Sequence, residues 1–353
     1  MIKLMVGNNF QTDFIDKLVE LNKKHESDLI RVNEVFGSIR SLNTLKTARP
    51  DFRVPDVNIK DFEFMNSKLY DNNIKINYTI NSPIVNHNTL KEKEVEEFIQ
   101  TLRKYKVSRV TVAHPLLMKV ISQVSDMPIE ISTIYKLEHS RQLFDLKEFA
   151  PNISKLCCHV FFNRNRFMLE EQKKYCDQLG IEFELIANEF CIQHCIVRDQ
   201  CYHAHVMNKT VEDTLLFGNW PMGYCISHRE RKPEEWLLAN FILPQHMNIY
   251  KDLFNINLFK ITGRTAPTKY LSWIVEQYLR MDFNENLLML WQDVKNIKRI
   301  AKGHQDYMTP KYKIDTKKIN DNFILFYLLA NQSISLEKEI EHIKKFLDLS
   351  LVK

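Results

Sequence analysis

Four cysteines gather in one stretch of a chain that otherwise uses cysteine sparingly. Cys191, Cys195 and Cys201 fall in "ANEFCIQHCIVRDQC" at residues 187–201, and Cys225 follows in "GYCISH". Thiolate sulfur is a ligand of zinc and of iron–sulfur clusters, and four thiolates complete either kind of site. The cluster therefore indicates a metal site or a catalytic thiol.

The spacing of these cysteines favours one metal centre over the other. Three, five and 23 residues separate them, so the C-x₂-C knuckle typical of structural zinc is absent. Irregular spacing along a long loop suits a 4Fe-4S cluster, whose ligands lie further apart. Two alternatives stay open: four unrelated buried thiols, and zinc held together with some of the nearby histidines, which are His194, His203, His205 and His228. The other three cysteines, Cys157, Cys158 and Cys176, are predicted to be packing residues.

Short β-rich runs alternate with helix-like stretches along the chain. Between the runs lie segments such as "DFIDKLVELNKKH", with apolar residues at helical spacing. Eight such alternations in 353 residues predict an α/β fold, a closed (β/α)₈ TIM-type barrel. The predicted strands are 2–6, 29–36, 74–81, 108–113, 129–134, 156–162, 182–187 and 258–262.

Polar residues follow several predicted strands, and a parallel barrel brings such residues together on one face. Asn77 lies near the end of the third strand, and Asn188 and Glu189 follow the seventh. Barrel active sites form at that carboxyl face. Each residue taken alone is more often a capping group, so only their shared position suggests a site.

The interval between the seventh and eighth strands is unusually long. Residues 188–257 contain all four clustered cysteines and begin at the functional end of the barrel. We therefore expect a barrel over residues 1–284 that includes this insertion, followed by a helical extension, 285–353, packed on the barrel.

Composition limits the classes of protein that need to be considered. The net charge of +5 is mildly basic and selects neither RNA nor a small anion as the partner. With seven glycines, the chain has no G-x-G-x-x-G or Walker loop. The first ten residues lack a signal-peptide pattern, and no apolar run approaches the roughly 18 residues of a membrane span. We expect a cytoplasmic protein that does not enter the membrane and keeps its thiols reduced.

Two motifs resemble the collagenase-like peptidase family U-32. They are "LIANEFCIQHC" at the predicted end of the seventh strand and "FKITGR" at the end of the eighth. The matching residues are Asn188, Glu189, Cys191 and Cys195, then Lys260, Ile261, Gly263 and Arg264. Weaker similarity lies in "NYTIN" (77–81) and "NR" (165–166), so the resemblance covers roughly residues 2–280.

The resemblance implies a chemistry as well as a fold. Some branches of this family carry a 4Fe-4S cluster and hydroxylate RNA bases or quinone precursors without oxygen, with prephenate as the hydroxyl donor. Cys191, Cys195, Cys201 and Cys225 would then bind the cluster. The other site residues that we expect are Glu189, His203 and His205 for catalysis, and Asn77, Asn165, Arg166, Asn188, Lys260 and Arg264 for substrate binding.

Arg264 has two possible roles at this stage. Its planar guanidinium could bind a substrate carboxylate through two parallel hydrogen bonds. It could equally form a salt bridge that closes the barrel.

Three hypotheses of different classes therefore remain. The first is an iron–sulfur hydroxylase that acts on a small molecule, an RNA base or a peptide. The second is a peptidase, although the chain has no H-E-x-x-H helix, G-x-S-x-G elbow or distinctive Cys–His–Asn signature. The third is a non-catalytic subunit that holds a cluster or zinc and binds a partner protein of the same family.

Overall fold

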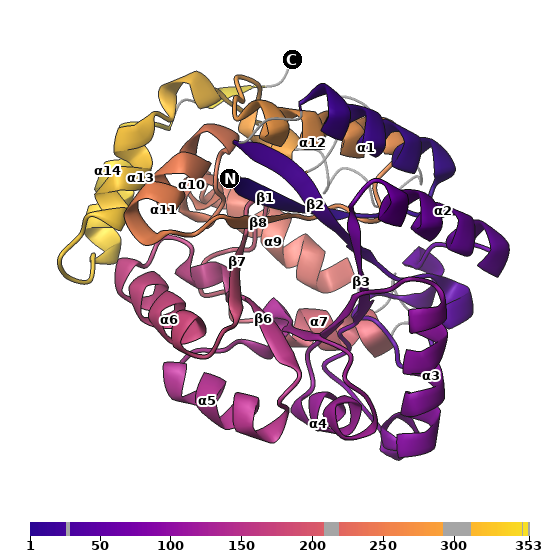
Figure 1. Ribbon diagram of the computed structural model, residues 1–353. Coiled ribbons are helices and arrows are strands. Elements are labelled where there is room, and N and C mark those ends of the chain that lie inside the picture. Colours follow the sequence, from indigo (N-terminus) through magenta and orange to yellow (C-terminus); the bar gives the residue numbers. More distant parts are fainter. Residues whose placement is uncertain (26–28, 208–218, 292–311, 348, 352–353) are drawn as a thin grey trace.

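Eight parallel strands close into a barrel in the computed structural model (Figure 1). The structure describes residues 1–25, 29–207, 219–291, 312–347 and 349–351. The strands pair in chain order, and β1 closes the ring by pairing with β8. Their bounds are β1 Ile2–Gly7, β2 Ile30–Gly37, β3 Lys75–Ile80, β4 Arg109–Val112, β5 Ile129–Ile131, β6 Ile153–Cys157, β7 Glu182–Ile186 and β8 Leu258–Ile261.

The predicted (β/α)₈ fold is thereby confirmed, although two strands differ from their predicted bounds. β5 ends at Ile131 rather than at residue 134, and a 3₁₀ helix follows at Thr133–Tyr135. β6 begins at Ile153, three residues before the predicted start, and ends at Cys157. Residues Val160–Phe162 form a 3₁₀ helix instead of the predicted end of the strand. Cys158 consequently lies beyond the strand, where it packs outward against Gln172 of the following helix.

Amphipathic helices surround the barrel because each buries one apolar stripe against the strands. In α3, for example, Val95, Phe98, Ile99 and Leu102 are buried at helical spacing. The surrounding helices are α1 Thr12–Lys24, α2 Ile59–Asp71, α3 Glu92–Lys104, α4 Pro115–Val124, α5 Ser140–Phe149, α6 Arg166–Gln178, α11 Met247–Phe254 and α12 Thr268–Arg280.

The insertion between β7 and β8 is largely helical, whereas we predicted an elaborated loop. It contains α7 (Arg198–Met207), α9 (Asn219–Arg231) and the short α10 (Glu235–Leu238), before the barrel helix α11. Figure 1 draws α7 and α9 across the interior of the ring. Residues 208–218 of this segment lie outside the described residues.

The C-terminal extension forms a small helical unit beside the barrel. Helices α13 (Asp321–Leu328) and α14 (Leu336–Lys344) pack together, with the His342 ring stacked 3.9 Å from the Phe326 ring. A two-stranded antiparallel sheet of β9 (Tyr312–Ile314) and β10 (Leu349–Leu351) accompanies them. Residues 292–311 lie outside the described part of the chain.

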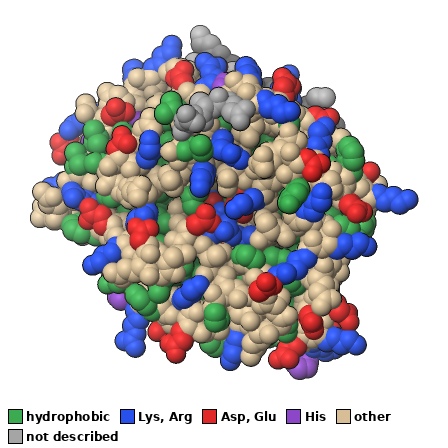
Figure 2. All heavy atoms as spheres, in the orientation of Figure 1, with side chains coloured by type: hydrophobic (Ala, Val, Ile, Leu, Met, Phe, Trp, Pro, Cys, Tyr) green, Lys and Arg blue, Asp and Glu red, His purple; other side chains and the backbone are tan. Residues whose placement is uncertain are grey.

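The surface gives no simple electrostatic signature. Figure 2 shows Lys and Arg side chains interspersed with Asp and Glu across the face that it displays. Among the described helices, none is long and apolar enough to span a membrane.

Candidate metal centre and barrel mouth

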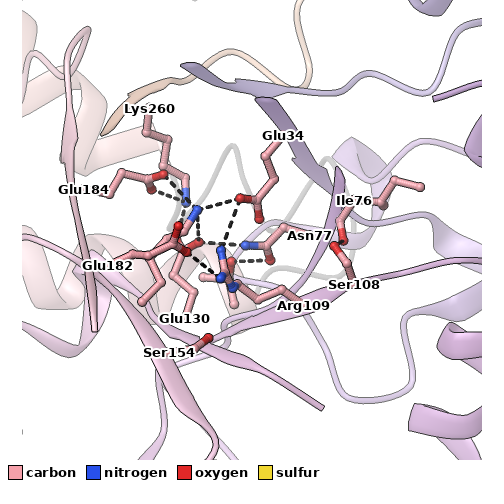
Figure 3. Close-up of polar contacts among 12 residues, drawn as sticks. Glu34, Ile76, Asn77, Ser108, Arg109, Glu130, Ser154, Glu182, Glu184 and Lys260 are labelled. Carbon is pink, nitrogen blue, oxygen red and sulfur yellow. Dashed lines mark hydrogen bonds and ion pairs between the residues drawn. The ribbon is translucent and has the colours of Figure 1, made fainter. Parts of the chain in front are cut away.

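The centre of the barrel is filled with ion pairs, where such barrels usually hold branched apolar side chains. Lys260 of β8 contacts Glu130 at 2.5 Å and Glu184 at 3.4 Å, and Lys155 of β6 contacts Glu34 at 2.6 Å and Glu184 at 3.3 Å. The five side chains come from five different strands, and Figure 3 shows Glu34, Glu130, Glu184 and Lys260 converging. All five are buried.

A second layer of charge lies nearer the amino ends of the strands. Arg109 contacts Glu34 at 3.2 Å and the half-exposed Glu182 at 2.5 Å. Asn77 donates to Glu130 at 2.7 Å and accepts from Thr111 at 2.7 Å. Every strongly buried charge in this interior therefore has a partner of opposite sign.

Pairing decides the ionisation of the interior. Burial alone would raise the pKa of Glu34, but the neighbouring charges of Lys155 and Arg109 outweigh it and lower that pKa to about 2. Burial also disfavours the charged form of Lys260, yet Glu130 and Glu184 hold its pKa above the usual value. The pKa of Glu184 is raised, mainly by burial. The ammonium groups of Lys155 and Lys260 thus stay charged.

One set of side chains in this interior has metal-like spacing. Ligand atoms of Glu130, Cys157 and Glu184 lie within 4.8 Å of one another. The ammonium groups of Lys260 and Lys155 already contact both carboxylates. The cationic side chains therefore supply the charge that an ion would bring.

A small cavity opens above this interior, at the carboxyl ends of the strands. Its volume is about 70 Å³, which is room for roughly two water molecules. Strand residues such as Thr79 and Lys260 line one side, and Glu189 and Tyr202 of the insertion line another. The insertion therefore covers the barrel mouth.

Arg264 is buried at this mouth, and two glycines allow it to lie there. A Cβ on Gly7 would lie 2.8 Å from the backbone nitrogen of Arg264, so only glycine lets the end of β1 come this close to the Arg264 backbone. Gly263 adopts φ +126°, a conformation open to glycine and strained for other residues. The "GR" of the sequence motif thus fixes the arginine at the end of β8.

The partners of Arg264 are hydroxyl groups. Its guanidinium donates to Thr47 at 2.8 Å, to Ser38 at 3.3 Å and to Thr79. No carboxylate of the described residues lies within ion-pair distance of Arg264, so the barrel-closing salt bridge is not formed. Burial, with the charge of Arg49 nearby, lowers the pKa of Arg264 to about 9.

The four clustered cysteines are all half-buried on the covering insertion. Cys191 and Cys195 lie on the segment after β7, Cys201 on α7 and Cys225 on α9. An interaction with the Cys225 thiol lowers the pKa of Cys195 to about 6 and raises the pKa of Cys225. The thiols of these two cysteines therefore lie close to each other.

Two buried arginines flank these thiols. Arg198 and Arg229 are each 2% exposed, and neither has a carboxylate within ion-pair distance among the described residues. Arg198 donates to the Tyr202 hydroxyl at 3.3 Å and interacts with the Cys191 thiol. Arg229 donates to the Phe190 carbonyl oxygen and lies over the Trp236 ring at 4.3 Å.

The thiols are spread more widely than a single small ion requires. Among the described residues, the triad of ligand atoms within 4.8 Å of one another is the Glu130 group, and no three of the four thiols form such a set. Zinc bound at about 2.3 Å to four sulfurs would hold them about 3.8 Å apart. Cys195 and Cys225 lie close together, but any three of the four thiols include a pair further apart than such a site allows.

Glu189 connects the thiols to the mouth cavity. Its carboxylate accepts hydrogen bonds from the backbone nitrogens of Phe190 at 3.0 Å and Cys191 at 3.1 Å. The same side chain lines the cavity that contains Arg264. Both sites therefore share one acidic residue.

The two predicted catalytic histidines have different environments. His205 lies one helical turn after Cys201, with its Nε2 atom 3.7 Å from the thiol sulfur, and burial lowers its pKa to about 4. His203 is exposed on α7. Only His205 therefore accompanies the thiols.

The predicted substrate-binding residues are not all brought together. Lys260 and Arg264 line the mouth cavity. Asn77 lies one layer deeper, and Asn188 joins the ends of β7 and β8 by accepting from Thr262 at 2.7 Å and 3.0 Å. Figure 3 shows Asn77 beside Glu130 and Glu34, and Asn77 is not among the residues that line the mouth cavity.

Asn165 and Arg166 lie elsewhere, at the start of α6. Asn165 caps that helix by accepting from Met168, and Arg166 pairs with Glu170 at 2.8 Å. Both line a separate, larger cavity. The structure therefore does not bring Asn165 and Arg166 together with Arg264.

Three residues of the site escaped the sequence analysis. Arg198 and Arg229 lie three and four residues from a clustered cysteine, so a basic residue within helical reach of each thiol was a usable signal. Cys157, which the sequence predicts to be a packing residue, lines the mouth cavity. Only the register of β6 could have revealed that inward orientation.

Comparison with known proteins places the chain in a family. The sequence pattern of peptidase family U32 matches residues 48–286. An uncharacterized protease of Methanocaldococcus jannaschii is 22% identical over 285 residues, which is 78% of this chain and 79% of that protein. The solved structure of a U32 peptidase aligns with a TM-score of 0.49 and 10% identity, over 76% of this chain and 94% of that one. The family resemblance carried by the two sequence motifs is confirmed, and the chain belongs to peptidase family U32.

Proposed function

We propose that this protein is an iron–sulfur enzyme whose cluster covers the mouth of the barrel. The observation that carries the proposal is the set of four half-buried thiols beside two buried arginines that lack carboxylate partners. Burying unpaired charge is costly unless a counter-charge is supplied. Four thiolates holding a 4Fe-4S cluster would supply that negative charge.

The donor set fits such a cluster better than it fits zinc. Sulfur is the ligand of both, but any three of the four thiols include a pair that lies further apart than a tetrahedral zinc site allows. Cys191, Cys195, Cys201 and Cys225 would hold the cluster, and Arg198 and Arg229 would balance its charge. A bound cluster supplies one-electron redox chemistry.

The mouth cavity suggests a substrate with a carboxylate group. Arg264 presents a buried guanidinium that is held by hydroxyl groups, so its charge is available to an anion. The volume of about 70 Å³ admits a carboxylate group rather than a whole aromatic acid. Glu189, between the thiols and this cavity, could give or accept a proton there. By resemblance, the reaction would be oxygen-independent hydroxylation with prephenate as the donor.

A peptidase is the second candidate, because both named relatives are described as a protease or peptidase. Cys201 and His205 are close enough to form a nucleophile–base pair. However, burial raises the pKa of Cys201 and lowers that of His205 to about 4, so the pair stays neutral. A cysteine peptidase needs the thiolate.

Metal analysis of cysteine variants made without oxygen tests the proposal. We expect iron and sulfide in the wild-type protein, with absorbance near 400 nm. Cys191→Ala, Cys195→Ala, Cys201→Ala and Cys225→Ala should each lose most of the iron. Cys176→Ala, which removes a buried thiol from α6, is the matched control and should keep it.

Two results would overturn the proposal. One is a wild-type protein that carries a single zinc and no iron after anaerobic preparation. The other is full iron loading in all four variants. Peptide cleavage that survives chelation and fails in Cys201→Ala would support the peptidase instead.

A further inference from the structure

A second cavity lies at the edge of the carboxyl face, apart from the mouth cavity. Its volume is about 470 Å³, and it shares no lining residue with the cavity around Arg264. The segment after β6, the loop between Cys191 and Cys195, residues 235–240 and the C-terminal extension form its walls. A cavity of this volume lies within the range of small-molecule sites.

One wall of this cavity is made by the C-terminal extension. Tyr327, Ile334 and Glu339 belong to α13, α14 and the turn between them, and they lie beyond residues 48–286, which match the family. The family resemblance therefore predicts nothing about what this cavity binds.

Arg164 brings a buried positive charge to the lining. The residue is 6% exposed, and no carboxylate of the described residues lies within ion-pair distance of its guanidinium. The guanidinium donates to the carbonyl oxygens of Leu237 at 2.6 Å and Phe241 at 3.3 Å, and the Tyr327 ring lies 5.2 Å away. These neutral partners hold the guanidinium in place and leave its charge unbalanced, which is costly for a buried ion.

Glu339 brings a carboxylate that also lacks a partner of opposite charge. It lies on α14 and is partly buried, and no cation of the described residues lies within ion-pair distance of it. Burial raises the pKa of Glu339, and the positive charge of Arg164 offsets that effect in part. The two residues therefore lie near each other in one lining without forming an ion pair.

The other charged side chains of the lining are already satisfied. Arg166 pairs with Glu170 at 2.8 Å, and Glu235 pairs with His228 at 3.2 Å. His194 is exposed, so water can satisfy its ring. A ligand of this cavity therefore meets one unbalanced cation and one unbalanced carboxylate.

Aromatic side chains make up much of the remaining wall. Phe161, Phe162 and Phe167 contribute rings from the segment after β6. Such rings bury apolar groups and pack well against another ring. The lining thus suits a ligand with one apolar end and an end that carries both charges.

We propose that this cavity binds a free α-amino acid with an apolar or aromatic side chain, and that Arg164 receives its carboxylate and Glu339 its ammonium group. Both charged groups of an α-amino acid are attached to one carbon, so a neighbouring cation and carboxylate can meet them together. Each added residue of a peptide moves its terminal charges up to about 3.5 Å further apart, which favours the single amino acid. The inference is independent of the iron–sulfur proposal, because it rests on a different cavity and needs no metal.

Calorimetric titration of the full chain with L-phenylalanine tests the proposal. We expect saturable binding to the wild-type protein. Two analogues each lack one charge: 3-phenylpropionate has no ammonium group, and phenethylamine has no carboxylate. Each analogue should bind at least tenfold more weakly than L-phenylalanine.

Removing one protein charge at a time assigns the two contacts. Glu339→Gln should weaken L-phenylalanine binding at least tenfold and leave the affinity for 3-phenylpropionate unchanged, because that probe has no ammonium group to lose. Glu337→Gln is the matched control, since Glu337 lies two residues earlier on α14 and outside the lining. That variant should bind L-phenylalanine as the wild type does.

Arg164→Met gives the complementary test. It should weaken L-phenylalanine binding at least tenfold and leave the affinity for phenethylamine unchanged, which also shows that the cavity is intact. If this variant does not fold, Glu339→Gln decides alone. The proposal is overturned if L-phenylalanine does not bind the wild-type protein, if either analogue binds as tightly as L-phenylalanine, or if Glu339→Gln leaves the affinity for L-phenylalanine unchanged.

Discussion

Buried cations have carboxylate partners in the barrel interior but not in the insertion that covers it. Lys155 and Arg229 are both 2% exposed. Lys155 has three carboxylates within 4 Å, namely Glu34, Glu130 and Glu184. Arg229, like Arg198 and Arg264, has none among the residues that the structure describes.

This difference distinguishes the structural core of the barrel from the candidate site in the insertion and at the mouth. Paired interior charges satisfy one another, so the barrel core is complete without a ligand. The arginines of the insertion and the mouth are held by carbonyl oxygens, hydroxyls and aromatic faces. These partners orient a guanidinium without neutralising it, which leaves each arginine able to balance an added anion.

Removing one interior cation should have the largest effect on stability. Lys155→Met leaves buried carboxylates without their partner, and breaking such a pair typically costs about 3–5 kcal/mol. Urea denaturation should show that loss in the free energy of unfolding. Arg229→Met, made in the metal-free protein, is the matched comparison and should change it little or raise it. Equal destabilisation by both substitutions would remove the distinction between the two regions.

Acid should weaken the interior through Glu34. Its pKa is about 2 in the folded protein against an ordinary 4.5, because Lys155 and Arg109 outweigh the effect of burial. A depressed carboxyl pKa stabilises the fold above its unfolded value, and that contribution is lost as the pH falls from about 4.5 to about 2. The difference corresponds to about 3 kcal/mol. Glu34→Gln should flatten this part of the stability–pH curve, and an unchanged curve would contradict the assignment.

The barrel was predictable because its periodicity is a local property of the sequence. Strands such as Ile2–Gly7 and Leu258–Ile261 are short, mostly apolar runs beside amphipathic helices, so pattern alone located them. β6 was misplaced because "VFF" after Cys158 has strong β-propensity, while the chain there turns into a 3₁₀ helix. Tertiary context overrode propensity at that point.

The site was only partly predictable because it depends on which face each side chain takes. Arg264 and Glu189 reach the mouth as expected. Asn77 and Thr79 both point inward from β3. Asn77 lies in the ion-pair layer, whereas Thr79, two residues further along the strand, lines the mouth cavity. Asn165 lies at the start of a helix outside the ring. No spacing in the sequence shows that this residue lies away from the barrel axis.

The arginines beside the thiols give a test that does not depend on substrate. If Arg198 and Arg229 balance the charge of a bound cluster, the cluster should be harder to reduce in Arg198→Met and in Arg229→Met, because reduction adds negative charge. We expect about a tenfold fall in the equilibrium constant for reduction, or 59 mV for one electron. Potentiometric titration followed by absorbance measures it. Arg166→Met, which lies on α6 and pairs with Glu170, should leave the potential unchanged.

Arg264→Lys should have the smallest effect and the most specific one. Lysine keeps a positive charge but loses the planar fork that binds both oxygens of a carboxylate. We expect the affinity for a carboxylate ligand, with prephenate as the probe, to fall roughly tenfold, about 1.4 kcal/mol, while iron content stays unchanged. Because no carboxylate of the described residues pairs with Arg264, the melting temperature should move little. A clear loss of stability with unchanged affinity would contradict this role. It would mean that the hydrogen bonds from Arg264 to Thr47 and Ser38 stabilise the barrel and that the anion binds elsewhere.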